Sequence, residues 1–407
     1  MSDSIWSDGG RIQMPQYEKL TRIKKVDVTI VGGGLCGLLC AYFLKEAGVE
    51  CLLLEGSRIA SGTVRHAMAQ VTSQHGLIYS RLLETLGEEK ARMYFEANEL
   101  ALHKYRELAA SIDCDFEERS SYIYSRTDKE CIEREVRAAS LLGMKAEFCE
   151  TPEAGAVRFP NQAQMNPVKF LYGLVKDIEK SDKVTIFEEM PVDDWINGTT
   201  WSGLYITIPK NIICTTHFPF YKKAGGYNNK LYQNRSYIMA LDHVPELHGM
   251  YADASDNGLA LRGYKDMIFV GGATHRVGQE ERDWNEFREK ILSYYPEAIE
   301  REHWEVEDCV SLDGIPYIGP YSDKTPNMYV ATGFNGWGMT SAMTAAMLLT
   351  DAIINGQKTN GATESYPWGE VFYPERKIVR SQYFANVKEN VRENIKSFLT
   401  RKSKIND

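Results

Sequence analysis

The hydrophobic positions near the start of the chain predict a strand, a helix and a second strand. Residues 26–31 (VDVTIV) form a short run rich in β-branched side chains, which is typical of a strand buried in a parallel sheet. Residues 38–48 (LLCAYFLKEAG) have helical character and end at a glycine, and residues 49–55 (VECLLLE) predict the second strand. This order of elements is that of a βαβ unit.

Three glycines lie between the first predicted strand and the helix. Gly32, Gly34 and Gly37 form the pattern G-x-G-x-x-G. The first glycine permits a tight turn, the second lets a pyrophosphate approach the backbone, and the third lets the helix pack on the strand. Glu55 ends the second strand, where a carboxylate accepts hydrogen bonds from ribose hydroxyls. Together these features predict a dinucleotide site; the alternative is a glycine-rich turn that binds nothing.

The rest of the chain predicts more strands and one long helical region. Residues 183–192 and 210–220 have the character of strands that extend the first sheet. Residues 82–111 have helical periodicity with charges on one face. Aromatic and β-branched segments predict further, antiparallel strands at 117–126, 235–241, 259–264 and 267–277.

The end of the chain predicts an amphipathic helix. Apolar side chains recur every three or four residues among lysines and arginines, at Phe384, Val387, Val391, Ile395 and Phe398. Three surfaces suit its apolar stripe: its own domain, another subunit, or a membrane to which the tail would bind peripherally.

Composition excludes several classes of function. The formal charge of −9 opposes a phosphate backbone, so we expect no nucleic-acid partner. No apolar run has the length of a transmembrane span, and the N-terminus lacks the pattern of a secretory signal, so we expect a cytoplasmic protein. The eight cysteines are scattered singly, which predicts reduced thiols and no metal site.

Two further segments indicate which nucleotide binds. Residues 61–76 (SGTVRHAMAQVTSQHG) are rich in small and hydroxyl side chains that can wrap a long cofactor. In residues 327–353, a strand leads through Gly333, Gly336 and Gly338 into a helix of small and apolar residues. The start of that helix is a second site favourable to negative charge, and two such sites suit FAD, whose diphosphate and reduced ring both carry it.

These motifs resemble a known family. VGGGLCG, ASGTVRHA, NIICTTH, DGIPYIG and ATGFNGWGMTSA occur in the order found in the FAD-dependent D-amino-acid-oxidase-like (DAO) superfamily, which includes glycine oxidase and gamma-glutamylputrescine oxidase. TSQHGLIY, RFPNQAQMNP and THFPFY are similar to a bacterial branch that carries a Rieske iron-sulphur domain. No Cys or His occurs after residue 365, so we expect no Rieske cluster within this sequence.

The resemblance implies an α/β fold, α+β overall, with a Rossmann-like FAD-binding domain and a discontinuous antiparallel-sheet substrate domain, or cap. The implied FAD-binding domain comprises residues 20–110, 155–217 and 305–365. The implied cap comprises residues 111–154 and 218–304, and residues 366–407 form the C-terminal helical tail.

The motifs and the resemblance together assign FAD as the cofactor and predict its contacts. These residues are Gly32, Gly34, Leu35, Cys36, Gly37, Glu55, Gly56, Ser61, Gly62, Thr63, His66, Ala67, Met68, Ala69, Gln70, Val192, Gly314, Phe334, Gly336, Trp337, Gly338, Met339 and Thr340. His66 matches the histidine that related dimethylglycine dehydrogenases bond covalently to flavin, although Arg65 replaces their tryptophan. A covalent link, a noncovalent contact and a structural hydrogen bond remain the alternatives for His66.

The implied activity is dehydrogenation of the C–N bond of a small amine or amino acid, with electrons passed to oxygen or a carrier protein. Oxidation of a hydroxyacid, and a non-catalytic FAD-holding subunit of an electron-transfer complex, are the alternatives. The catalytic residues stay unassigned. Candidates for binding substrate, from the predicted cap strands, are Arg235, Tyr237, Arg262, His275 and Arg276.

Overall fold

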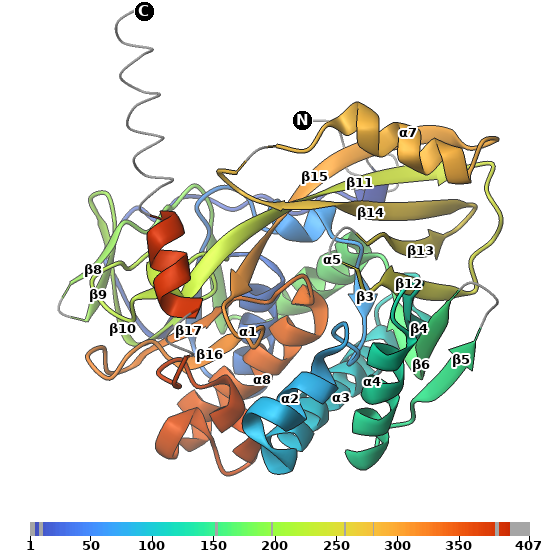
Figure 1. Ribbon diagram of the computed structural model, residues 1–407. Helices are drawn as coiled ribbons and strands as arrows, with labels where there is room; N and C mark the ends of the chain where they lie inside the picture. Colours follow the sequence, from blue (N-terminus) through green and yellow to red (C-terminus); the bar gives the residue numbers. More distant parts are fainter. Residues whose placement is uncertain are drawn as a thin grey trace, which may run out of the picture.

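Two β-sheets and the helices packed around them organise the chain (Figure 1). The computed structural model describes residues 5–7, 11–150, 154–196, 198–255, 258–279, 281–378 and 382–390. Its mixed parallel and antiparallel architecture confirms the predicted fold class.

Sheet A is built around parallel strands drawn from distant parts of the sequence. Its main order is β16-β17-β10-β1-β2-β7, in which every neighbouring pair except β16 and β17 is parallel. These strands are β16 (Tyr317–Pro320), β17 (Met328–Thr332), β10 (Tyr205–Cys214), β1 (Lys24–Val31), β2 (Cys51–Leu54) and β7 (Val184–Phe187). Strands β8 (Asp194–Ile196) and β9 (Thr199–Ser202) extend β10 as an antiparallel ribbon. The two strands predicted to extend the first sheet, β7 and β10, do so.

Sheet B is antiparallel except where β12 pairs with β4. Its order is β15 (Ile299–Ser311), β11 (Leu231–Asp242), β14 (Met267–Arg276), β13 (Ala260–Tyr264), β12 (Gly249–Asp253), β4 (Glu117–Ser125), β6 (Gly155–Gln164) and β3 (Gln70–Val71), with β5 (Glu147–Glu150) beside β6. Strands β3 and β6 and the second half of β15 belong to this sheet, although the predicted boundaries assign them to the FAD-binding domain.

Helices cover the two sheets. α1 (Leu35–Glu46) contacts α5 (Pro167–Ile178) and α8 (Gly338–Asn355), and α8 contacts α3 (Glu88–Ala109). α7 (Trp284–Tyr294) lies along β14 at the top of Figure 1. The remaining helices are α2 (Ile78–Leu86), α4 (Lys129–Leu141), α6 (Tyr227–Lys230) and the 3₁₀ helices η1 (Ile5–Ser7), η2 (Thr63–His66), η3 (Thr359–Gly361) and η4 (Pro367–Phe372).

The βαβ unit forms as predicted, and its helix ends in a Schellman motif. Gly48 adopts φ +72° and donates its N–H to the Lys45 carbonyl at 2.9 Å. Val49 donates to the Leu44 carbonyl at 2.9 Å. The glycine satisfies two otherwise unpaired carbonyls at the helix end and turns the chain into β2.

The long helical region predicted at 82–111 is interrupted. Gly87, at φ +82°, ends α2 and immediately precedes α3. A left-handed glycine stops an α-helix because the next residue departs from the helix axis. The charge pattern continues across Gly87, so the sequence predicted one helix where the structure has two.

The tail is helical over residues 382–390, and the rest of the predicted amphipathic stripe lies outside the described residues. This short helix docks through Asn386, which donates to the carbonyls of Asn229 and Leu231 at 2.9 and 3.2 Å. Within the described ranges, none of the helices combines the length and apolarity needed to cross a bilayer.

Candidate functional site

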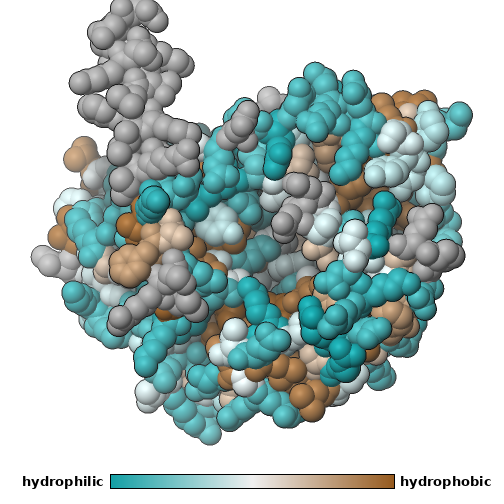
Figure 2. Space-filling view, in the orientation of Figure 1, coloured by the Kyte–Doolittle hydropathy of each residue, from teal (hydrophilic) through white to brown (hydrophobic). Residues whose placement is uncertain are grey.

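A deep cavity lies where the two sheets meet. Its volume is about 900 Å³, and its lining comes from the ends of β1 and β2, the starts of α1 and α8, and one face of sheet B. Figure 2 shows the surface hollowed in the middle of this face of the molecule. A cavity of this size, open to solvent and lined by small and apolar residues, is typical of a cofactor and substrate site.

The first end of the cavity is the glycine turn between β1 and α1. A Cβ added to Gly37 would lie 1.9 Å from the carbonyl oxygen of Gly32, whereas one added to Gly34 would meet no atom within 4 Å. Gly34 caps the helix without a side-chain hydrogen bond, so the first N–H groups of α1 remain available to a ligand. The glycines therefore have two separate roles, packing at Gly37 and an open approach at Gly34, as in dinucleotide turns.

Glu55 sits directly beyond β2, on the edge of this turn. Its carboxylate accepts hydrogen bonds from the backbone N–H groups of Gly33 at 2.7 Å and Ser57 at 2.8 Å. These bonds fix the side chain while leaving acceptor positions free, since a carboxylate offers about four. The arrangement fits the two hydroxyls of a ribose.

We expect Glu55→Gln to weaken FAD binding by about 10- to 100-fold, because the amide has one acceptor oxygen fewer and its NH2 group must oppose the N–H donor of either Gly33 or Ser57. A fluorescence titration of flavin-free protein with FAD measures the change. Glu50→Gln is the matched control, since Glu50 is exposed just before β2. Equal loss in both variants would show that Glu55 has no specific role.

Residues 67–69, which precede β3, form one wall of the cavity, and a buried arginine binds their backbone on the side away from the cavity. Arg262 donates hydrogen bonds to the carbonyls of Met68, Ala69 and Met165, the last two at 3.0 and 3.2 Å. Gln70, which follows Ala69, lines the cavity, and its buried side-chain Nε2 has no protein partner. A buried amide donor without a partner is costly, and a bound ligand with acceptor atoms would satisfy it.

The second end of the cavity is the start of α8. Trp337 caps this helix without a side-chain hydrogen bond, and Gly336 before it adopts φ +79°. The indole of Trp337 stacks on the imidazole of His75, with ring centroids 5.1 Å apart. The exposed N–H groups at the start of α8 favour negative charge in the cavity.

Two titratable side chains face the cavity near this end. Burial raises the pKa of Asp308 to about 6 and lowers the pKa of His217 below its ordinary value. His217 also has a buried Nε2 without a hydrogen-bond partner. Like Gln70, it offers an unsatisfied polar atom to a bound group.

The cavity brings together most of the predicted FAD contacts. All but four of them line it; the exceptions are Gly37, His66, Gly314 and Thr340. Gly37 packs beneath the turn, and Thr340 donates a hydrogen bond to the carbonyl of Thr72 at 3.0 Å. Gly314, at φ +71°, lies against Arg81, and His66 accepts a hydrogen bond at its carbonyl from Trp304 at 2.9 Å.

The cavity does not bring together the five substrate-binding candidates, none of which lines it. Arg235 pairs with Glu307 at 2.7 Å, and Tyr237 stacks on Trp284 with centroids 4.0 Å apart. Arg262 lies behind the wall described above. The remaining two also have structural contacts: the His275 ring bonds to the Ala273 carbonyl, and Arg276 bonds to Asn390 and covers the Tyr232 ring.

The lining instead includes residues that the sequence did not single out. On β11 these are Asn234, Ser236 and Ile238, which alternate with Arg235 and Tyr237. Thr215, Thr216 and His217 follow β10 directly. Ligands in open parallel sheets bind beyond the carboxyl ends of the strands, but the strand predicted at 210–220 ran past these three residues, whereas β10 ends at Cys214.

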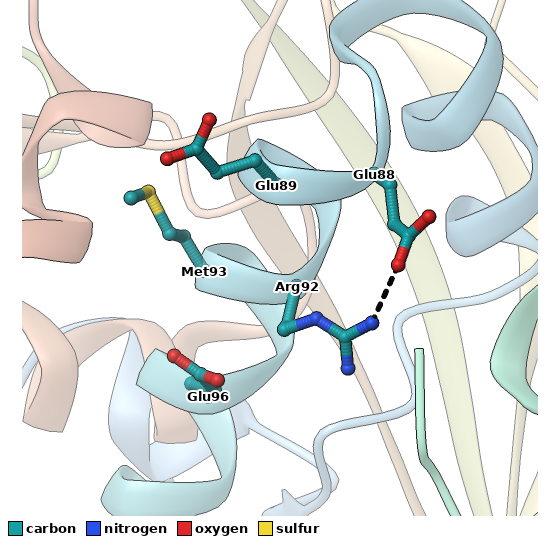
Figure 3. A pocket seen from close by; sticks show the side chains of 5 residues that line it. All are labelled: Glu88, Glu89, Arg92, Met93 and Glu96. Carbon is teal, nitrogen blue, oxygen red and sulfur yellow. Dashed lines mark hydrogen bonds and ion pairs between the residues drawn. The ribbon is translucent and has the colours of Figure 1, made fainter. Parts of the chain in front are cut away.

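A second, smaller hollow lies on the first turns of α3 (Figure 3). It is lined by Glu88, Glu89, Arg92, Met93 and Glu96, and the guanidinium of Arg92 pairs with Glu88 at 2.7 Å. Solvated carboxylates beside a paired arginine offer no converging ligand set. Within the described residues, no cluster of three or more His, Cys, Asp or Glu is arranged to hold a metal ion.

Comparisons with known proteins agree with this geometry. The family model described as "FAD dependent oxidoreductase", DAO, matches residues 27–352. The putative Rieske 2Fe-2S iron-sulfur protein YhfW of Bacillus subtilis is 32% identical over 386 residues, which cover 89% of this chain and 74% of that protein.

Solved structures share the fold at low identity. Glycine oxidase from Geobacillus kaustophilus superposes with a TM-score of 0.71 at 16% identity, covering 88% of this chain and all of that one. L-proline dehydrogenase from P. horikoshii gives 0.70 at 14% identity, covering 87% and 98%.

The family model spans the glycine turn, Glu55, most of sheet B and the start of α8, which together form the cavity. The unsatisfied polar atoms of Gln70 and His217 and the two free helix starts fit the cofactor that this family implies. The chain belongs to the DAO family of FAD-dependent oxidoreductases.

Proposed function

We propose that this chain oxidises the C–N bond of a small amine or amino acid, with FAD in the cavity as the electron acceptor. The observation that carries the proposal is the composition of the cavity beyond the start of α8. There the lining is sheet B, with small, neutral side chains such as Asn234, Ser236 and Thr274 and one carboxylate, Asp308. Oxidation of an amine by flavin needs positioning more than acid–base residues, and such a wall supplies it.

The absence of a suitable cation disfavours substrates with a carboxylate or phosphate beside the reacting carbon. These are hydroxyacids and phosphorylated alcohols and, on the same ground, α-amino acids relative to simple amines. Among the described lining residues, Arg58 is the one arginine, no lysine occurs, and Arg58 pairs with Glu188 at 2.6 Å at the dinucleotide end. A carboxylate or phosphate substrate normally requires an arginine or lysine beside the reacting carbon. The glycine oxidase and L-proline dehydrogenase that share this fold are named for substrates that contain a C–N bond.

The residues of the chain have separable parts in this reaction. The N–H groups at the start of α1 bind the diphosphate of FAD, and Glu55 binds the ribose. When bound, FAD supplies an acceptor for the hydride that leaves the carbon of the C–N bond. The N–H groups at the start of α8 stabilise negative charge at that end of the cavity. Gln70 and His217 offer their unpaired nitrogens to the cofactor, and sheet B forms the wall on the substrate side.

An anaerobic visible spectrum tests the proposal. FAD-loaded protein is mixed with amines, D- and L-amino acids, N-methyl amino acids and hydroxyacids, and bleaching of the oxidised flavin bands is recorded. We expect bleaching by at least one amine or amino acid and none by hydroxyacids. Bleaching by hydroxyacids alone would replace the proposal with oxidation of a C–OH bond, and bleaching by nothing would favour an FAD-holding subunit. Readmission of oxygen then separates an oxidase from a dehydrogenase.

We expect the flavin to be held without a covalent bond. His66 does not line the cavity, so its ring lacks the placement that a bond to the flavin requires. Precipitation with acid should release all of the flavin into the supernatant. A fluorescent protein band on a denaturing gel that disappears in His66→Ala would contradict this prediction.

A further inference from the structure

One carboxylate stands alone at the substrate end of the cavity. Asp308 lies on β15 and lines the cavity beside the start of α8, where a Cβ added to Gly336 would be 3.8 Å from its Oδ2. Among the described residues the carboxylate has no hydrogen-bond or ion-pair partner, and burial is the sole cause of its raised pKa. The side chain is half-buried and faces the cavity, so its carboxylate, which has no protein partner, is accessible to a cationic ligand.

The surroundings of Asp308 contain no permanent positive charge. Its partner on the neighbouring strand β11 is Asn234, which is neutral. His217 also lines the cavity, and burial lowers the pKa of its imidazole, which favours the uncharged form near neutral pH. The thiol of Cys309 is neutral because burial raises its pKa to about 11.

Charged groups elsewhere are already neutralised or distant. Arg235 lies on the opposite face of sheet B, where its guanidinium pairs with Glu305 and Glu307 at 3.3 and 2.7 Å. Glu55 and Arg58 lie at the dinucleotide end of the cavity. The negative charge of Asp308 is therefore the dominant charge at the substrate end.

We propose that Asp308 is the specificity-determining residue of this site, and that it binds the cationic amino group of a substrate that has no carboxylate next to the oxidised carbon. The bound ammonium loses one proton, to the Asp308 carboxylate or to solvent, before hydride leaves the carbon and the nitrogen lone pair forms the C=N bond. The inference rests on the proposed C–N oxidation and narrows its substrate to amines. In an α-amino acid the carboxylate is two bonds from the nitrogen. Its charge would lie close to Asp308 with no arginine or lysine to separate the two, which disfavours binding.

A matched pair of unreactive ligands tests the charge preference. tert-Butylamine is a cation with no hydrogen on the carbon beside its nitrogen, so flavin cannot oxidise it, and pivalate is its carboxylate counterpart. Each is titrated into the FAD-loaded protein while the difference spectrum of the oxidised flavin is recorded. We expect tert-butylamine to bind and pivalate to leave the spectrum unchanged at the same concentration. Equal binding of both ligands would overturn the inference.

Asp308→Asn keeps the shape of the side chain and removes its charge. We expect this substitution to lower the affinity for tert-butylamine on the order of 30-fold or more, because it removes one partner of a charge pair. Glu307→Gln is the matched control, because Glu307 directly precedes Asp308 on β15 and points to the other face of the sheet. Unchanged affinity in Asp308→Asn, or an equal loss in both variants, would overturn the inference.

A measurement on the unaltered protein does not depend on whether the variants fold. Affinity for tert-butylamine should fall as the pH is lowered through about 6, because Asp308 becomes neutral while the ligand stays cationic. Affinity that stays constant between pH 8 and pH 5 would count against Asp308.

The substrate panel separates this inference from the proposed function. We expect alkylamines to reduce the flavin at least tenfold faster than α-amino acids with the same side chain. Reduction by amino acids at equal or higher rates would overturn the role of Asp308 and leave C–N oxidation standing. Reduction by neither class would remove the proposed function and this inference with it.

Discussion

Gly37→Ala is expected to destabilise the fold by about 3 kcal/mol or more and to abolish FAD binding. The added methyl group would lie 1.9 Å from the backbone carbonyl oxygen of Gly32, and neither backbone can yield without moving α1 away from β1. That movement would open the turn whose N–H groups bind the diphosphate. Urea unfolding and titration with FAD measure the two effects.

Gly34→Ala is the matched control in the same turn. A Cβ there meets no protein atom within 4 Å, and the backbone at φ −80° suits any residue. We expect its stability to stay within about 0.5 kcal/mol of wild type. Its FAD affinity should still fall, because the methyl group projects into the open approach to α1. Wild-type stability and FAD affinity in Gly37→Ala would contradict the account of this turn.

Arg376→Met is expected to lower the free energy of unfolding by about 3–5 kcal/mol. The guanidinium of Arg376 makes two hydrogen bonds to the carboxylate of Asp313, at 2.7 and 2.8 Å. It also donates to the carbonyls of Ile315 and Pro316 and lies 4.0 Å from the centroid of the Tyr317 ring. The methionine would fill the space and leave the partly buried carboxylate without its charged partner, which urea unfolding would detect.

Lys377→Met is the control for Arg376→Met, because it removes a positive charge from the exposed neighbouring position. We expect a change of at most about 0.5 kcal/mol. A similar loss of stability in both variants would mean that Arg376 acts through net charge and does not clamp the 313–317 segment.

The stabilisation from Arg376 should depend on pH in one direction. Although burial alone would raise the pKa of Asp313, the charge of Arg376 and its hydrogen bonds hold that pKa below its usual value. The contribution is therefore fully present above the pKa of an unfolded aspartate, about 3.9. It is lost as the pH falls through the lower, folded value. The stabilities of wild type and Arg376→Met should converge at acidic pH.

The dinucleotide half of the molecule is predictable because its signals are local. Gly32, Gly34 and Glu55 lie in one short segment, between strands whose apolar runs identify them. The same holds for Gly336 and Trp337 at the start of α8. In each case a backbone requirement, a turn or a free helix start, constrains the residues directly, so sequence and structure agree.

The substrate wall is not predictable in this way, because polar side chains lie on both faces of sheet B. The cavity lies against Asn234 and Ser236, whereas α7 covers the face of Tyr237, whose ring stacks on Trp284. When polar side chains occur on both faces of a strand, the polar pattern does not say which side chains face the cavity. The candidates Arg235 and Tyr237 each lie one position from a lining residue, and adjacent side chains of a strand point to opposite faces of the sheet.

Asp308 was missed for a related reason. It follows Glu305 and Glu307 in an acidic stretch that resembles a solvated strand, and pairing of these two with Arg235 on the outer face leaves Asp308 alone on the inner one. The chemistry of the residue depends on the strand's orientation, which tertiary packing decides.

The central claim, that the cavity binds FAD, is tested most directly by titrating flavin-free protein with FAD. The account predicts saturation at one FAD per chain, with the visible bands of protein-bound oxidised flavin, and a loss of affinity in Gly34→Ala and Glu55→Gln without a loss of folding. A folded protein that binds no FAD, or one whose affinity is unchanged in both variants, would contradict it.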